Sequence, residues 1–163
     1  MFTFQDYLNF NQAVDTQKQR QIFDQTTLSQ ECLQQLKKVT TEQHFLVLAE
    51  PFCPDCLIFV PIVEKMAQAN PYIKLKYLPR SELDNKAKFD SLKQQKVVKE
   101  TYNIPSLFKI TPQQTTVIYK EFPEKLKQEM LANNDKFEQM KQDYRLGKYQ
   151  QLIEQQILQA LMP

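Results

Sequence analysis

Two cysteines separated by two residues lie between a short apolar segment and a longer one. Residues 45–50, Phe-Leu-Val-Leu-Ala-Glu, form a continuous apolar run that a proline ends, and this length is typical of a β-strand covered on both faces. Residues 54–69 are again mostly apolar and predict a helix with Pro54 in its first turn. Cys53 and Cys56 are therefore expected where a buried strand passes into a helix.

Three further strands are expected after this junction. Residues 72–78 alternate apolar and lysine side chains, which favours a strand at a sheet edge with one solvated face. Residues 106–110 and 115–119 predict two strands joined by a hairpin-like turn, and a polar helix is expected at about 83–95. A strand–helix–strand crossover followed by a hairpin predicts an α/β fold, with a small four-stranded mixed sheet flanked by helices.

The chain is expected to form a single domain, because no linker-like stretch divides residues 1–163. Residues 1–39 predict an N-terminal helical extension, 40–122 the α/β core, and 123–163 a C-terminal helical extension. In the last extension we expect helices that pack on one another, with Gly147 as a helix cap.

Composition excludes several classes of protein. Twenty-one Lys and Arg residues against 19 Asp and Glu give a net charge of +2, with both signs interspersed, so no nucleic-acid or membrane-surface partner is predicted. No apolar run approaches the roughly 20 residues that cross a bilayer, and the first residues show no signal-peptide pattern. A cytoplasmic location follows as an expectation. In a reducing compartment, a close cysteine pair indicates redox chemistry or metal binding.

The spacing of the two cysteines suits disulfide exchange. Cys53 is expected at the helix N-terminus, where unpaired N–H groups and the helix dipole favour a thiolate. Cys56 follows one turn later, is expected to be more buried, and is near enough to close a disulfide with Cys53. The exposed sulfur can attack a substrate disulfide, and the buried one can then resolve the mixed disulfide.

A metal site is the main chemical alternative for this pair. A structural zinc site needs about four ligands, and among Cys and His only Cys32 and His44 remain. Cys32 fits the apolar face of its own predicted helix, and His44 is expected at the surface or in a turn. We therefore expect neither a metal nor an organic cofactor.

Several segments together resemble the thioredoxin superfamily, in particular bacterial thioredoxin-like proteins with helical extensions. The segment Phe52–Cys56 reads Phe-Cys-Pro-Asp-Cys, and Pro61 follows five residues later, where that family has a proline inside the helix. Tyr102–Leu107 resembles the family's cis-proline loop, and Tyr144–Tyr149 resembles the subgroup's C-terminal extension. The core resemblance covers about residues 40–122.

The resemblance implies a thioredoxin-like fold and a thiol–disulfide oxidoreductase. It implies that Cys53 is the nucleophile, Cys56 the resolving cysteine, and Pro105 a cis-proline facing them. Protein or small-molecule disulfides are the implied substrates, together with an unidentified reducing partner. A binding module that keeps the cysteines with little turnover is the alternative. Substrate contacts are expected from Phe52, Pro54, Asp55, Ile104 and Pro105.

This sequence departs from the family pattern at two positions. Typical thioredoxins have a buried Asp six residues before the first cysteine, whereas this chain has Val47. Glu50 is the nearest acid, and we expect a solvated strand-end carboxylate there rather than a substitute for that Asp. Asp55, between the two cysteines, is expected to oppose the ionisation of Cys53, because a neighbouring negative charge disfavours a thiolate.

Overall fold

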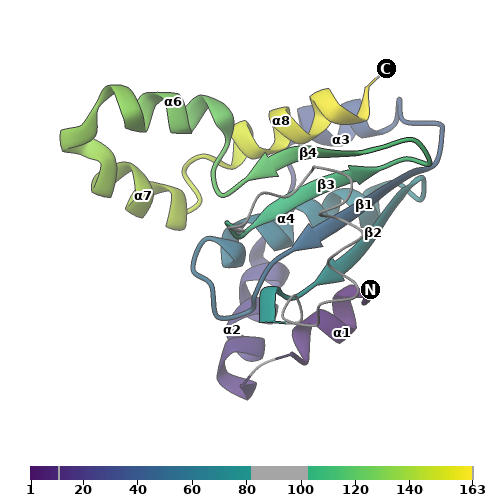
Figure 1. The fold of residues 1–163 in the computed structure, drawn as a ribbon, viewed down its shortest axis with the longest axis horizontal. Helices are drawn as coiled ribbons and strands as arrows, with labels where there is room; N and C mark the ends of the chain where they lie inside the picture. The colour runs from purple at the N-terminus through teal and green to yellow at the C-terminus, as the bar shows by residue number, and fades with distance from the viewer. Residues whose placement is uncertain (11, 82–102, 163) are drawn as a thin grey trace.

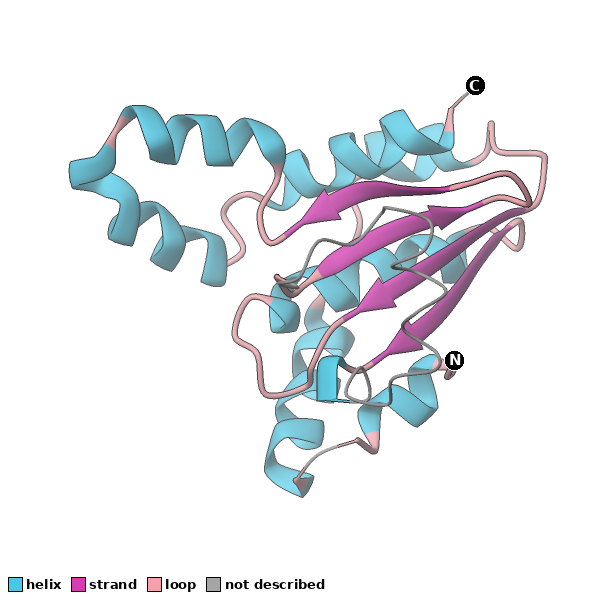
Figure 2. Ribbon diagram, in the orientation of Figure 1, coloured by secondary structure: helices cyan, strands magenta, loops and turns pink. Residues whose placement is uncertain are grey.

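A four-stranded mixed sheet forms the centre of the protein, shown in Figures 1 and 2. The structure is a computed structural model, and it describes residues 1–10, 12–81 and 103–162. β1 (Gln43–Leu48) pairs in parallel with β2 (Ile73–Leu78) and antiparallel with β3 (Ser106–Ile110), which pairs antiparallel with β4 (Thr115–Lys120). The strand order β2-β1-β3-β4 confirms the predicted α/β fold and places β2 at a sheet edge.

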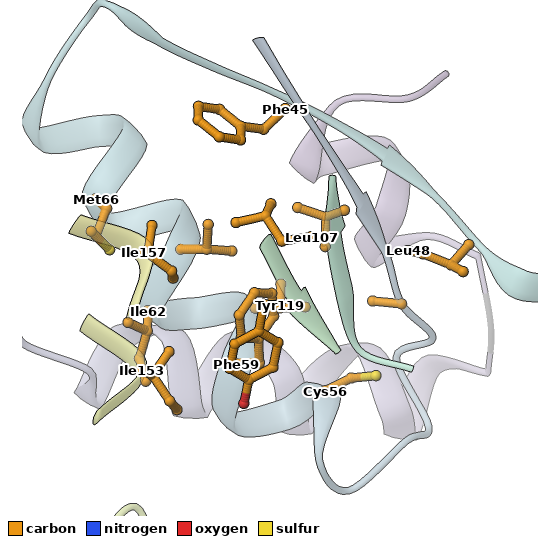
Figure 3. Packing of buried hydrophobic residues seen from close by; sticks show 14 of the residues in the cluster. Phe45, Leu48, Cys56, Phe59, Ile62, Met66, Leu107, Tyr119, Ile153 and Ile157 are labelled. Carbon is orange, nitrogen blue, oxygen red and sulfur yellow. The ribbon is translucent and has the colours of Figure 1, made fainter. Parts of the chain in front are cut away.

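The helix α4 (Cys56–Ala69) makes the crossover between β1 and β2 and lies behind the sheet in the view of Figure 1. It is apolar on most of its surface, which suits a helix that other elements cover on several sides. Phe59 of α4 stacks on Tyr119 of β4 with ring centroids 4.3 Å apart, and buried Cys56 belongs to the same hydrophobic cluster (Figure 3). The core therefore extends without interruption up to the cysteine motif.

Three helices precede the sheet: α1 (Phe4–Leu8), α2 (Ala13–Gln25) and α3 (Gln30–Leu36). Short α1 begins with a capping box between Thr3 and Asp6, and it packs against β2. Helix α2 packs along α4, as the two elements contact each other closely. The predicted N-terminal helical extension therefore covers both an edge of the sheet and the motif-bearing helix.

The chain ends in α6 (Glu124–Ala132), a 3-10 turn η2 (Asn134–Lys136), α7 (Phe137–Arg145) and α8 (Gln150–Leu161). The amphipathic helix α8 buries Ile153, Ile157 and Leu161 against α3, α4 and β4. Figure 1 shows α6 and α7 projecting beyond the end of the sheet at which β4 ends. The loop that carries Cys53 lies at this same end.

Gly147 ends α7 as a helix cap, which confirms the sequence-based prediction. Its φ is +80°, its N–H donates to the carbonyl of Tyr144, and the N–H of Lys148 donates to the carbonyl of Asp143. These two bonds form a Schellman motif, for which glycine is favoured because it has no Cβ.

The predicted helix at 83–95 lies outside the described residues. In the part of the chain that the structure describes, no helix has the length and apolar character needed to cross a membrane.

Candidate functional site

The two cysteines lie in the connection from β1 to α4. The carbonyl of Cys53 accepts the N–H of Leu57 at 3.1 Å, so Cys53 supplies an early acceptor of the helical hydrogen-bond series. The N–H of Cys56 donates to the Cys53 sulfur at 3.3 Å, and both cysteines are free thiols. Cys53 is 7% exposed and Cys56 fully buried. The arrangement brings both sulfurs together at a helix start, with only Cys53 in reach of solvent.

The pKa of the Cys53 thiol is lowered. The main cause is a hydrogen bond with the Cys56 side chain, and the backbone N–H groups of Cys56 and Asp55 lower the pKa further. Burial and the negative charge of Asp55 act in the opposite direction without reversing the shift. The expected opposition from Asp55 is therefore present, and hydrogen bonds to the sulfur outweigh it.

The pKa of the Cys56 thiol is raised well above its usual range. Burial is the largest cause, followed by the hydrogen bond to Cys53 and the charge on that neighbour. Cys56 thus holds the proton of the pair while Cys53 is the group that ionises more readily. This inequality is the chemical basis of a nucleophilic and a resolving thiol.

A loop that precedes β3 faces the Cys53 sulfur. The Ile104–Pro105 peptide bond is cis, as the resemblance implied. The Cys53 sulfur lies 4.0 Å from the carbonyl oxygen of Ile104, and the carbonyl of Pro105 accepts the N–H of Glu121 at 2.7 Å. The start of α4 and the cis-proline loop, which are 51 residues apart in the sequence, therefore meet at one sulfur. Tyr102, at the start of the segment quoted for this loop, lies outside the described residues.

The other expected contact residues differ in exposure. Phe52 is 50% exposed and Pro54 is exposed as well, so both can touch a substrate beside Cys53. Asp55 is mostly buried, and its carboxylate accepts two hydrogen bonds from Arg145 of α7, at 2.7 and 3.3 Å. The structure thus places Asp55 in a contact with the C-terminal extension.

Sequence reasoning missed Arg145 as part of this site. It lies 90 residues after Asp55, and for its segment the sequence favours helix packing over the alternative of covering a ligand groove. Arg145 is one of 21 basic residues, and no spacing signal in the sequence distinguishes it from surface charges.

The prediction that Glu50 is solvated is wrong. Its side chain is 1% exposed, and one carboxylate oxygen accepts the N–H of Ser81 at 2.6 Å. A backbone N–H group therefore binds the buried carboxylate in place of water. Val47 is fully buried in the sheet, so the departure from the family's Asp leaves an apolar side chain there.

Three buried tyrosines surround the motif. Tyr7 of α1 donates to Gln19, and the hydroxyls of Tyr119 and Tyr144 are 2.8 Å apart. Burial is the main cause that raises the pKa of each phenol, and negative charge on the cysteines adds to the shift. These residues remain neutral at neutral pH and make the surroundings of Cys56 poor in water.

In the described ranges, no three His, Cys, Asp or Glu side chains are grouped so that they could hold a metal ion. His44 is exposed and pairs with Glu42 at 2.9 Å, which confirms its predicted surface position. Cys32 is buried on its helix, as predicted, and burial raises its pKa to about 12.

Comparisons with known proteins agree with the fold. A family model described as thioredoxin matches residues 1–152. No curated protein matches the chain. A solved protein of unknown function from Pseudomonas aeruginosa is 18% identical, with a TM-score of 0.72 and coverage of 98% of this chain and 90% of that one. An HIV epitope-scaffold is 16% identical, with a TM-score of 0.74 and coverage of 98% and 91%.

At these identities the two solved structures show likeness of fold alone. The family model, in contrast, spans nearly the whole sequence, including the strand, the cysteine pair and most of the C-terminal extension. The chain therefore belongs to the thioredoxin family.

Proposed function

We propose that this protein is a thiol–disulfide oxidoreductase that exchanges disulfides through Cys53 and Cys56. The observation that carries the proposal is the inequality of two neighbouring thiols. Cys53 accepts an N–H bond at a helix start and has a lowered pKa, whereas fully buried Cys56 has a raised one. Two structural cysteines would not need this difference.

Exchange would proceed in two displacements. The Cys53 thiolate attacks a substrate disulfide, a Cys53–substrate S–S bond forms, and the other substrate sulfur leaves as a thiolate that takes up a proton. Cys56 then loses its proton and attacks the Cys53 sulfur, which releases the second substrate thiol and forms the Cys53–Cys56 disulfide. Two electrons have passed to the substrate, and a dithiol reductant must then reduce the Cys53–Cys56 disulfide back to two thiols.

The substrates would be protein or small-molecule disulfides in the cytoplasm. Phe52 and Pro54, the exposed neighbours of Cys53 in the chain, could contact such a substrate, and the carbonyl of Ile104, which precedes buried Pro105, lies 4.0 Å from the Cys53 sulfur. An extended segment lying against the Pro105 loop could add backbone hydrogen bonds, as in strand addition.

Reduction of insulin disulfides by dithiothreitol tests this function. We expect the wild-type protein to accelerate the reaction and Cys53→Ser to abolish the acceleration. Cys56→Ser should accumulate a mixed disulfide on Cys53, while Cys32→Ser, which alters a buried thiol outside the motif, serves as the matched control and should stay active. Equal rates for wild type and Cys53→Ser would refute the proposal.

A binding module with little turnover is the second candidate. It is favoured by the low exposure of Cys53 and by the contact that Arg145 of α7 makes with Asp55 of the motif. The same assay separates the two, because a binding module would leave the uncatalysed insulin reduction unchanged while the thiols remain intact.

A further inference from the structure

Arg145 joins the C-terminal extension to the cysteine motif. Its Nε donates to Oδ1 of Asp55 at 2.7 Å, and a terminal nitrogen donates to Oδ2 at 3.3 Å. Two such bonds engage both carboxylate oxygens, the bidentate geometry that guanidinium and carboxylate favour. The side chains are only 27% and 12% exposed, so water screens this pair less than an ordinary surface ion pair.

The position of Arg145 is fixed by its neighbours in α7. Tyr144, the residue before it, is fully buried and shares a hydrogen bond with Tyr119 of β4. Gly147, two residues after Arg145, ends the helix in a Schellman motif. The guanidinium is therefore held at the motif by the packing of the helix end, and it is not a freely rotating surface side chain.

The carboxylate that Arg145 binds acts on both thiols. The negative charge of Asp55 raises the pKa of Cys53 and that of Cys56. Negative charge on Cys53 in turn contributes to a raised pKa of Arg145. Because an electrostatic attraction is a single energy shared by its two partners, the same interaction favours the Cys53 thiolate.

The other titratable groups near the pair bring no compensating positive charge. Tyr7 of α1, Tyr119 of β4 and Tyr144 of α7 have raised pKa values and are neutral at neutral pH. Glu50, which follows β1, is acidic, and its negative charge contributes to the raised pKa of Tyr7. Within residues 1–10, 12–81 and 103–162, the cation that interacts with the motif is Arg145, through its ion pair with Asp55.

We propose that Arg145 is a positioning residue of the exchange site, which holds the Asp55 carboxylate in an ion pair so that the Cys53 sulfur ionises beside a neutralised neighbour. The inference rests on the proposed function and gives the C-terminal extension a chemical role in it. A stabilised Cys53 thiolate favours the reduced form, so this contact makes the Cys53–Cys56 disulfide a stronger oxidant.

The test is the pKa of Cys53, measured from the pH dependence of its alkylation by iodoacetamide and resolved by peptide mass spectrometry. Arg145→Gln should raise this pKa by about one unit, so that about tenfold less thiolate remains at any pH below both pKa values. Lys148→Gln is the matched control, because Lys148 has the same charge and pairs with Asp143 in the same region. This control should leave the Cys53 pKa unchanged.

Rescue separates an electrostatic role from a structural one. In the double variant Arg145→Gln, Asp55→Asn, we expect the Cys53 pKa to return to the wild-type value or below, since the repelling carboxylate is gone. Asp55→Asn alone keeps the side-chain size and should lower the Cys53 pKa, so it supplies an answer even if Arg145→Gln fails to fold.

Any of four results would overturn the proposal. The Cys53 pKa could stay unchanged in folded Arg145→Gln, or shift equally in Lys148→Gln. It could fail to return to the wild-type value in the double variant, or fail to decrease in Asp55→Asn. These readings are independent of turnover. If the wild-type protein did not accelerate insulin reduction, the result would count against the proposed function. If the wild-type protein accelerated it but the Cys53 pKa were the same in Arg145→Gln, only the role of Arg145 would be refuted.

Discussion

Limiting iodoacetamide should discriminate strongly among the three thiols of the reduced protein. Burial raises the pKa of Cys32 from the ordinary thiol value of 9.0 to about 12, while the pKa of Cys53 is lowered from that same ordinary value. The gap of at least about 3 units leaves Cys32 with at least about 1,000-fold less thiolate at neutral pH. Each thiolate gains nucleophilicity as its pKa rises, with a Brønsted slope of about 0.4–0.5, which offsets roughly 15- to 30-fold of this difference.

Cys53 should therefore alkylate at least about thirtyfold faster than Cys32 on chemical grounds alone. The burial of Cys32, which is 1% exposed, increases the ratio further by restricting access. Quenching the reaction at several times and quantifying each modified peptide by mass spectrometry gives the individual rates. The fully buried Cys56 should also lag behind Cys53. Comparable rates for Cys53 and Cys32 in folded protein would refute the assignment of Cys53 as the ionising thiol.

Three further predictions concern stability and follow from single contacts, each measured by urea unfolding. Gly147→Ala should lower the free energy of unfolding by about 1–2 kcal/mol, because a φ of +80° is unfavourable for a residue with a Cβ even though no atom lies within 4 Å of that Cβ. An unchanged unfolding midpoint would contradict this. Ser29→Ala should lower the free energy of unfolding by about 1–2 kcal/mol, because the Ser29 hydroxyl accepts the N–H of Cys32 and donates to buried Glu154. The free energy of unfolding of the reduced protein should fall by about 1.4 kcal/mol per pH unit above about pH 9 through Cys32, because the thiol of the unfolded chain, with its ordinary pKa of 9.0, loses its proton there, whereas the folded one keeps its proton until about pH 12. Cys32→Ala should reduce that slope, and an identical slope would count against the raised pKa.

Local patterns in the sequence were sufficient to predict the sheet. The apolar run at 45–50 predicted β1, which the structure places at Gln43–Leu48, because a strand covered on both faces cannot alternate with polar residues. Alternating lysines predicted the edge position of β2, since one face there remains solvated. The strand at 106–110 has the same bounds in sequence and structure. These features depend on neighbours in the chain, which a single sequence displays.

Contacts between distant segments were not predictable in the same way. The bond from Arg145 to Asp55 depends on how α7 projects past the sheet, and neither side chain belongs to a periodic pattern. The burial of Glu50 depends on the path of the backbone after β1 and on an N–H group from Ser81. A charged residue at a strand end looks solvated in the sequence, because its hydrogen-bond partners are supplied by tertiary structure.

The central claim is that Cys53 and Cys56 form a reversible redox pair, and equilibration with mixtures of reduced and oxidised glutathione tests it most directly. Acid quenching, alkylation and mass spectrometry report the state of each cysteine at every ratio. The account predicts one two-electron transition in which an intramolecular disulfide forms between Cys53 and Cys56, while Cys32 remains a thiol. The account would be contradicted if both thiols stayed reduced at every ratio, or if Cys53 formed only a glutathione adduct and no intramolecular disulfide.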